Sequence, residues 1–223
     1  MDAYEREFID FMVRAGVLTF GDFVAKSGRK TPYFVNTGKY RTGAQLRTLA
    51  RAYADAIERN VGRDVDVLFG PAYKGIPLVV AVSMELAERG HDVGFCFNRK
   101  EAKDHGEGGT LIGWNLRDGD RVLIVEDVTT AGTSIRETVP LLRGAANVKL
   151  AGLVVAVDRM ERGTGMKSAL AEIAETYAFQ TFSITSIEDI VSHLRDHEVD
   201  GRRVITDEIH ERIALYRREY GPR

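Results

Sequence analysis

The segment VLIVEDVTTAGTS, residues 122–134, carries the clearest structural pattern in the chain. It starts with four apolar residues, as a buried strand does, and the acids Glu126 and Asp127 follow where that strand should end. Small and hydroxyl-bearing residues then lead into a helix that we expect over 134–143. The order strand, short loop, helix is the repeating unit of a parallel α/β sheet.

The loop after this strand has the composition of an anion-binding site. Its small residues allow several backbone N–H groups to converge, and the helix N-terminus adds a partial positive charge. The adjacent carboxylates could accept hydrogen bonds from sugar hydroxyls, so the segment suits a phosphorylated sugar. The alternative is a capped helix after an ordinary strand, because Thr and Ser are good caps. Two adjacent acids at a buried strand end are costly without a partner, which favours the binding site.

The same alternation extends outward along the chain. Short apolar runs alternate with helical patterns, which predicts a parallel sheet covered on both faces. Right-handed crossovers place the loops after the strands along one sheet edge, where ligands bind. We expect strands over 65–69, 93–97, 122–125, 150–157 and 181–184, helices over 3–14, 44–58, 76–89 and 134–143, and short extended pieces within 17–43. The tail 211–223 is expected to form a surface helix, with packing across a partner as the alternative.

Composition limits the classes of protein that this chain can represent. It has 223 residues, with 31 Lys and Arg against 33 Asp and Glu, a net charge of −2. This balance argues against a nucleic-acid or polybasic membrane binder, and no apolar run is long enough to span a bilayer. The acidic start does not resemble a signal peptide, and Cys96 stands alone, so we expect a cytoplasmic protein.

Two glycine-rich segments resemble nucleotide-binding motifs without matching them. In GPAYKGIP, Gly70 and Gly75 have the spacing of a Walker loop, but Ile76 and Pro77 stand where Lys and Ser or Thr are required. In HGEGGT, Leu111 follows where GxGxxG needs its last glycine. Neither a P-loop kinase nor a Rossmann dinucleotide-binding protein is therefore indicated.

The pair Glu126-Asp127 followed by TTAGTS resembles the phosphoribosyl diphosphate (PRPP) motif of type I phosphoribosyltransferases. Other segments resemble orotate phosphoribosyltransferases and occur in that family's order: KSGRKTPYFVNTG (26–38), FGPAYKGIP (69–77), NRKEAKDHGEGG (98–109) and DRMERG (158–163). Several motifs in the right order are far more specific than one, and the resemblance spans residues 20–165.

The resemblance implies the type I phosphoribosyltransferase fold, an α/β fold with a mainly parallel sheet flanked by helices, a small N-terminal hood and a mobile lid loop. Residues 1–223 would form a single domain. Within it, 1–60 would be the hood contributing the orotate site, 61–185 the PRPP-binding core, and 186–223 a C-terminal helical segment. A non-proline cis peptide is also implied within Ala72–Lys74.

The implied reaction transfers the phosphoribosyl group from PRPP to orotate, giving orotidine 5′-monophosphate and diphosphate in pyrimidine biosynthesis. The implied cofactor is Mg²⁺, held mainly by PRPP and water rather than by protein ligands. By resemblance the catalytic residues are Lys100, Lys103, His105, Glu126 and Asp127. The implied PRPP site comprises Lys26, Tyr73, Lys74, Arg99, Lys100, Lys103, His105, Glu126, Asp127, Val128, Thr129, Thr130, Ala131, Gly132, Thr133 and Ser134. The implied orotate site comprises Lys26, Phe34, Val35, Thr130 and Arg159.

The family also implies a homodimer with shared active sites, in which the lid covers the neighbouring subunit's PRPP, and no nucleic-acid or membrane partner. Two positions depart from the usual family pattern. Glu126 stands where an aspartate is usual, which leaves its reach toward the ribose open. Val35 stands where many members have Phe, but the implied contact there is through the backbone.

Two other functions remain open at this point. A different phosphoribosyltransferase would share residues 122–134 but not Lys26, the Phe34 segment and Arg159 in these contexts. A PRPP-binding regulator would usually add a DNA-binding segment, and none is evident. His193 and His197 lie four residues apart on an expected helix, but no third ligand is near in sequence, so we do not expect a metal site. Cys96 alternates with Phe95 and Phe97, which indicates a core position.

Overall fold

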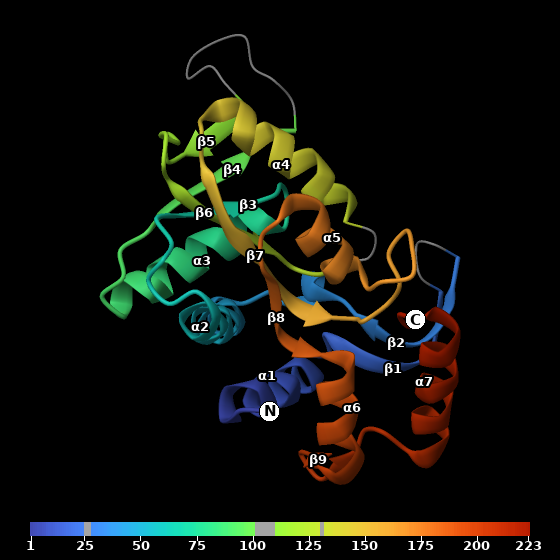
Figure 1. The fold of residues 1–223 in the computed structure, drawn as a ribbon. Helices are drawn as coiled ribbons and strands as arrows, with labels where there is room; N and C mark the ends of the chain where they lie inside the picture. The colour runs from blue at the N-terminus through green and yellow to red at the C-terminus, as the bar shows by residue number, and fades with distance from the viewer. Residues whose placement is uncertain (25–27, 101–109, 130–131) are drawn as a thin grey trace.

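The computed structural model describes residues 1–24, 28–100, 110–129 and 132–223 (Figure 1). Its main sheet has six strands in the order β5-β4-β3-β6-β7-β8. All neighbours are parallel except β5, which pairs antiparallel with β4 at the edge. The strands are β3 (Val67–Gly70), β4 (Gly94–Asn98), β5 (Leu111–Gly113), β6 (Arg121–Glu126), β7 (Lys149–Asp158) and β8 (Thr181–Ser186).

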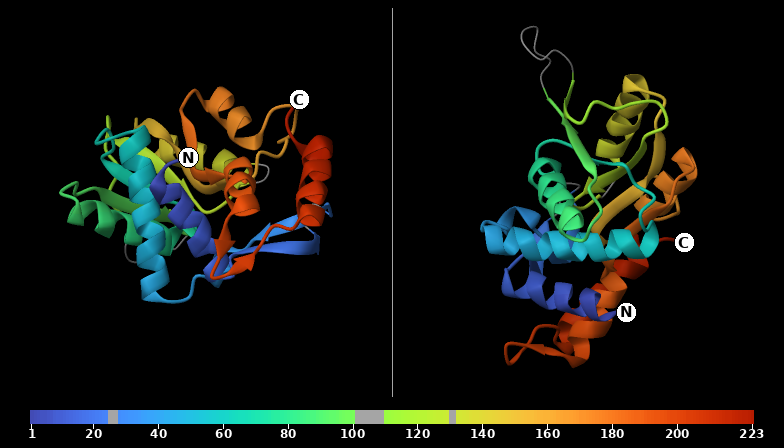
Figure 2. Two further views of the ribbon diagram at one scale, coloured as in Figure 1. Left: turned by 90° about the horizontal axis from the view of Figure 1, so that it is seen from below. Right: turned by 90° about the vertical axis from the view of Figure 1, so that its left-hand side faces the viewer.

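Helices cover both faces of this sheet, because its strands are apolar on both sides. Along β6, Leu123 and Val125 join one buried cluster while Val122 and Ile124 join the other. The helices α4 (Thr133–Ala145) and α5 (Ala169–Tyr177) pack on one face. On the other lie α1 (Ala3–Arg14), α2 (Gly43–Asn60), α3 (Gly75–Glu88) and α6 (Ile187–Asp196), and the views in Figure 2 show these layers. The last helix, α7 (Asp207–Tyr220), lies beyond this layer.

A small antiparallel hairpin stands apart from the main sheet. It consists of β1 (Leu18–Val24) and β2 (Lys30–Val35), with the short 3₁₀ helix η1 (Thr37–Lys39) after it. The last helix, α7, lies against this hairpin, as Figure 1 shows. A second small pair, β9 (Glu198–Val199) and β10 (Arg202–Arg203), follows α6.

The expected strands and helices of the core are confirmed, with ends that shift by one or two residues. The helix expected over 3–14 has those bounds, and Cys96 is fully buried in β4. The cis peptide lies between Ala72 and Tyr73, within the implied range. No described helix is both long enough and apolar enough to cross a membrane.

One expectation near the C-terminus is wrong and another is confirmed. His197 is not on the helix that carries His193, because α6 ends at Asp196 and His197 has extended backbone angles. The surface helix expected in the tail is confirmed as α7, which starts at Asp207 and buries Ile213 and Tyr216 where it meets the hairpin. Its apolar positions are few, so the sequence pattern alone did not indicate this packing.

Candidate active site

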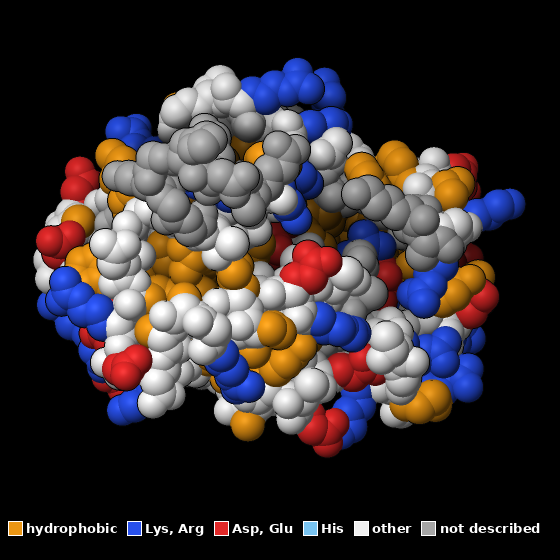
Figure 3. Space-filling model, turned by 90° about the horizontal axis from the view of Figure 1, so that it is seen from above, with side chains coloured by type: hydrophobic (Ala, Val, Ile, Leu, Met, Phe, Trp, Pro, Cys, Tyr) orange, Lys and Arg blue, Asp and Glu red, His pale blue; other side chains and the backbone are white. Residues whose placement is uncertain are grey.

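The carboxyl ends of the parallel strands bring four loops to one edge of the sheet. Strands β3, β4, β6 and β7 end at Gly70, Asn98, Glu126 and Asp158, and the segments that follow them contain most of the motifs described above. Seen from above, acidic and basic side chains lie near one another toward the middle of this face (Figure 3). Ligands of open α/β sheets bind at such an edge.

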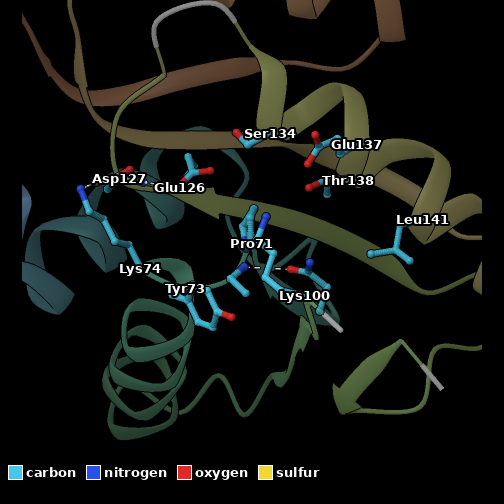
Figure 4. A pocket seen from close by; sticks show the side chains of 12 residues that line it. Pro71, Tyr73, Lys74, Lys100, Glu126, Asp127, Ser134, Glu137, Thr138 and Leu141 are labelled. Carbon is cyan, nitrogen blue, oxygen red and sulfur yellow. Dashed lines mark hydrogen bonds and ion pairs between the residues drawn. The ribbon is translucent and has the colours of Figure 1, made fainter. Parts of the chain in front are cut away.

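A pocket of about 180 Å³ lies between the loop after β3, the end of β6 and the start of α4 (Figure 4). It is polar, with both acids and lysines on its wall. Its lining residues are Pro71, Ala72, Tyr73, Lys74, Asn98, Lys100, Glu126, Asp127, Ser134, Glu137, Thr138 and Leu141.

The two adjacent carboxyl groups of this pocket differ in their electrostatics. Burial, together with the neighbouring charge of Asp127, raises the pKa of Glu126 to about 7. Burial also acts to raise the pKa of Asp127, but a hydrogen bond from Thr37 and the ammonium of Lys74 outweigh it and lower that pKa. Near neutral pH, Asp127 is therefore ionised, whereas Glu126 exchanges its proton in this range.

Asp127 is held by groups from two other elements. The Thr37 hydroxyl donates to its Oδ2 at 2.5 Å, and Lys74 Nζ lies 3.0 Å from the same oxygen. Lys74 also lies 3.3 Å from Thr37 Oγ1, so η1, the loop after β3 and the end of β6 meet at one carboxylate. The lysine side chain is 60% exposed and can turn to meet an anionic ligand.

The loop after β3 depends on two glycines that approach each other closely. A Cβ added at Gly70 would lie 2.3 Å from the carbonyl oxygen of Gly75, and one added at Gly75 would lie 2.6 Å from the carbonyl carbon of Gly70. Real Cβ atoms do not come this close, so neither position accepts a side chain without backbone movement. Asn98 secures the loop by accepting a hydrogen bond from the Ala72 N–H at 2.8 Å.

The start of α4 provides the positive helix end expected for phosphate. Gly132 precedes the helix with a φ of 70°, a left-handed conformation that favours glycine. Its N–H donates to Thr129 Oγ1 at 3.2 Å, which shapes the turn. Ser134, in the first turn, lies on the pocket wall and hydrogen-bonds Glu126.

Arg159 belongs to a separate buried cluster. Its Nε and Nη2 donate to Glu161 Oε1 at 2.9 and 2.5 Å, and its guanidinium lies 4.8 Å from the ring centroid of Tyr33. The same carboxylate oxygen accepts from the hydroxyls of Tyr33 and Tyr216, at 3.2 and 2.9 Å, and Arg29 lies 3.8 Å from the other oxygen. The hairpin, the loop after β7 and α7 therefore share one ionic centre.

The structure brings together only part of the predicted site. Tyr73, Lys74, Lys100, Glu126, Asp127 and Ser134 line the pocket, and Val128, Thr129, Gly132 and Thr133 lie in the adjoining turn and helix start. Arg99, Phe34, Val35 and Arg159 are not on its wall. Lys26, Lys103, His105, Thr130 and Ala131 lie outside the described residues.

Several residues of the site were not expected from the sequence. Thr37, Asn98 and Glu161 lie within motif segments, so their polar character next to the expected residues was a usable signal. Glu137 and Thr138 follow Ser134 by one helical turn, and the 3.6-residue period could have placed them beside it.

The comparisons with known proteins identify the family of the chain. The profile of the phosphoribosyl transferase domain family matches residues 38–184. The orotate phosphoribosyltransferase of Clostridium beijerinckii is 57% identical over 222 residues, and that of Laribacter hongkongensis is 48% identical over 223, each covering at least 99% of both chains.

Solved structures show the same likeness. The crystal structure of orotate phosphoribosyltransferase from Francisella tularensis superposes with a TM-score of 0.83 at 37% identity, over 96% of this chain and 99% of that one. The Mycobacterium tuberculosis orotate phosphoribosyltransferase in complex with PRPP has a TM-score of 0.62 at 20% identity, over 84% of this chain and 98% of the other, a likeness of fold.

Proposed function

The chain belongs to the orotate phosphoribosyltransferase family, whose reaction transfers the phosphoribosyl group of PRPP to orotate, and from this we propose how its residues divide the work. The observation that carries the division is Asp127, fixed by Thr37 and Lys74 beside the N-terminal end of α4. One carboxylate thus lies between a cation and a phosphate-binding turn, as PRPP requires.

The 5′-phosphate binds in the turn 128–134. The support for this is the left-handed Gly132, the hydroxyls of Thr129 and Ser134, and the helix end behind them. In this role Val128, Thr130, Ala131 and Thr133 contribute backbone N–H groups or hydroxyls. A phosphate held here fixes the position of the ribose for attack at its anomeric carbon.

Basic side chains of two loops are proposed to stabilise the negative charge of the departing diphosphate. Lys74 and Lys100 are on the pocket wall, and Tyr73 beside them is 70% exposed. Arg99 follows β4, and Lys103 and His105, with Lys26 from the hairpin loop, complete the proposed set. Their task is to meet charge that grows as the bond to the ribose breaks.

The ribose hydroxyls are the proposed partners of Glu126 and Asp127. Asp127 accepts hydrogen bonds and stabilises positive charge on the ribose, and the proton of Glu126 lets that group donate or accept near neutral pH. The pocket also fits Mg²⁺ bound to PRPP, because carboxylate oxygens line its wall. These oxygens can accept hydrogen bonds from the water ligands of the ion. When bound, Mg²⁺ neutralises part of the diphosphate charge.

Orotate is proposed to lie between the hairpin and the loop after β7, with Lys26, Phe34, Val35, Thr130 and Arg159 around it. Glu161 occupies the Nε–Nη2 edge of Arg159, and a guanidinium has a second edge, Nη1 and Nη2, that suits another carboxylate. Glu161 thereby positions Arg159. In this proposal, residues 1–60 form the hood of one domain, 61–185 the PRPP core and 186–223 the helical segment behind the hood.

We further propose that the protein works in the cytoplasm as a homodimer with shared sites. The dimer is supported by a groove of about 360 Å³ between α2 and α3, with Leu46 and Ala81 on its wall and Met84 67% exposed. A second copy would cover this apolar surface.

Substrate choice tests the function. With PRPP and Mg²⁺, orotate should react with a kcat/KM at least about a hundredfold above that of uracil, because uracil lacks the carboxylate and loses charge-assisted hydrogen bonds. The R159K variant keeps the charge but not the bidentate edge, so its preference for orotate should shrink while its uracil rate stays similar. Pyrophosphate release measures both, and equal kcat/KM for the two bases in the wild type would overturn the proposal.

A further inference from the structure

Three side chains far from the catalytic pocket converge at the contact of α1 with α6, two helices that lie side by side in Figure 1. His193 Nε2 lies 2.9 Å from Asp10 Oδ1, and His197 Nε2 lies 3.2 Å from Asp10 Oδ2. The two imidazoles stack with their centroids 4.5 Å apart. Asp10, 183 residues before His193, is the third partner that sequence spacing did not indicate.

We propose that Asp10, His193 and His197 bind a divalent transition-metal ion of the Zn²⁺ type. One nitrogen from each histidine and a carboxylate oxygen lie within 4.8 Å of one another. Bonds of about 2.0 Å in a tetrahedral site place ligand atoms about 3.3 Å apart. The two nitrogen–oxygen distances, each to a different oxygen of Asp10, are near this value, so side-chain rotations that bring both nitrogens around one ion would complete the site.

The backbone under the cluster is rigid, which favours preorganised binding. On α1, Ile9 and Met12 are fully buried, and on α6 so are Ile190 and Leu194. These contacts fix the two helices independently of the cluster. The ligands therefore do not have to be gathered from a disordered chain, and the ion can bind the folded protein directly.

Exposure of the three groups suits an ion with a water ligand. The side chain of His193 is 9% exposed and that of Asp10 15%, whereas His197 is 46% exposed. The inner pair is thus shielded while the outer histidine leaves a route for the ion and room for water. Two imidazoles and one carboxylate form a donor set that suits zinc, and three protein ligands plus water is a known zinc arrangement.

The charges near the cluster favour the binding of a cation, although one arginine opposes it. Asp10 supplies one negative charge, and a neutral imidazole can carry its proton on Nδ1, leaving Nε2 free to coordinate. Arg14 opposes binding, because its Nη2 lies 3.7 Å from Asp10 Oδ2. That arginine is half exposed and also pairs with Asp200 at 3.0 Å, so it can move away from the ion.

A simpler interpretation is that the three groups only tie α1 to α6 by hydrogen bonds. The two interpretations share every contact, but only the metal site predicts saturable binding of one ion per chain. No residue of the cluster lines the catalytic pocket, so the bound ion would stabilise the fold and take no part in the reaction.

Titration with the metal alone tests the proposal. Chelator-treated, tag-free protein without PRPP or Mg²⁺ is titrated with Co²⁺, followed by visible absorption, and with Zn²⁺, followed by calorimetry and by the thermal midpoint. We expect one equivalent of either ion, the absorption of a low-symmetry Co²⁺ site, and a raised midpoint with Zn²⁺.

His197→Ala is the first variant, because this side chain is half exposed and the fold should tolerate its loss. Replacing a residue that only hydrogen-bonds a metal ligand typically lowers metal affinity about 10–100-fold. Loss of a ligand itself should therefore weaken binding at least about a hundredfold. Asp10→Asn keeps the size of the side chain and should have a similar effect. His210→Gln, in α7 beside Arg195, is the matched control and should bind as the wild type does.

Two outcomes would overturn the site. One is that the wild type binds neither ion, and the other is that its binding survives in both folded variants, as shown by circular dichroism. Orotate turnover with PRPP and Mg²⁺ should be the same in wild type and His197→Ala, which separates this proposal from the catalytic one.

Discussion

The carboxyl group of Glu126 lies at the end of a buried strand, and only 7% of the surface of this residue is exposed. Because its pKa is raised from 4.5 to about 7, the folded protein holds a proton there that the unfolded chain releases. Below pH 4.5 the group is protonated in both states. As the pH rises from 4.5 through 7, the folded state therefore loses stability relative to the unfolded chain.

Glu126→Gln should remove this dependence, because the amide stays neutral. We expect its thermal midpoint to match that of the wild type near pH 4.5 and to exceed it by a few degrees at pH 8, which corresponds to about 1–3 kcal/mol. Thermal unfolding of both ligand-free proteins across this range measures the difference.

Glu137→Gln is the matched control for that experiment. It removes an exposed acid from the same pocket, so its midpoint should follow that of the wild type at every pH. A difference between Glu126→Gln and wild type that does not change with pH would contradict the raised pKa.

Individual residues also show how far the sequence could predict the site. Glu126 and Asp127 were predictable because they follow an apolar strand directly. The pairing of Arg159 with Glu161, Tyr33 and Tyr216 was not, since it joins three segments that only folding brings together. Asp10 illustrates the same limit, because the distance along the chain conceals its contact with His193.

Among the elements, those with a complete apolar pattern were predictable. The strand and helix positions of the core followed from alternating apolar runs, but β5 has only three residues and pairs through its backbone. The helix α5 was also not predicted, because it is short and follows the polar segment 158–168. These elements depend on neighbours that a local pattern does not contain.

The start of α4 gives a prediction that concerns a whole element. Gly132→Ala would place a Cβ 3.0 Å from Ile173 Cδ1 in a left-handed conformation that costs about 1–2 kcal/mol. The turn that presents the helix N-terminus should therefore shift, and PRPP affinity should fall about tenfold or more, as calorimetric titration with PRPP would show.

Gly144→Ala, in the last turn of the same helix, is the matched control. A Cβ there meets nothing within 4 Å, and alanine favours helix, so PRPP affinity should be unchanged and stability equal or higher. If both variants bound PRPP as the wild type does, the role of the turn in phosphate binding would be wrong.

For the whole molecule, the proposed shared site can be tested by mixing inactive subunits. Suppose that Lys103→Ala and Asp127→Asn are each nearly inactive as homodimers. Random exchange makes about half of the dimers mixed. If Lys103 acts on the partner's site, each mixed dimer has one intact site, and activity should return to about a quarter of the wild-type value.

If Lys103 acts within its own chain, every site keeps one lesion and no activity returns. Exchange has to be shown independently, for instance by mass spectrometry of the mixture. No recovery after proven exchange would exclude the shared site while leaving the assignment of the reaction intact.

The carboxylate of Glu161 has a consequence for the order in which the molecule is completed. It accepts hydrogen bonds from the hydroxyl groups of Tyr33, which is made early, and of Tyr216, which is made late. A ribosome makes the arginine, the glutamate and the first tyrosine well before the second. During synthesis, the ion pair of Arg159 with Glu161 can therefore form before α7 exists, and the last hydrogen bond to this carboxylate is added only when Tyr216 has been made.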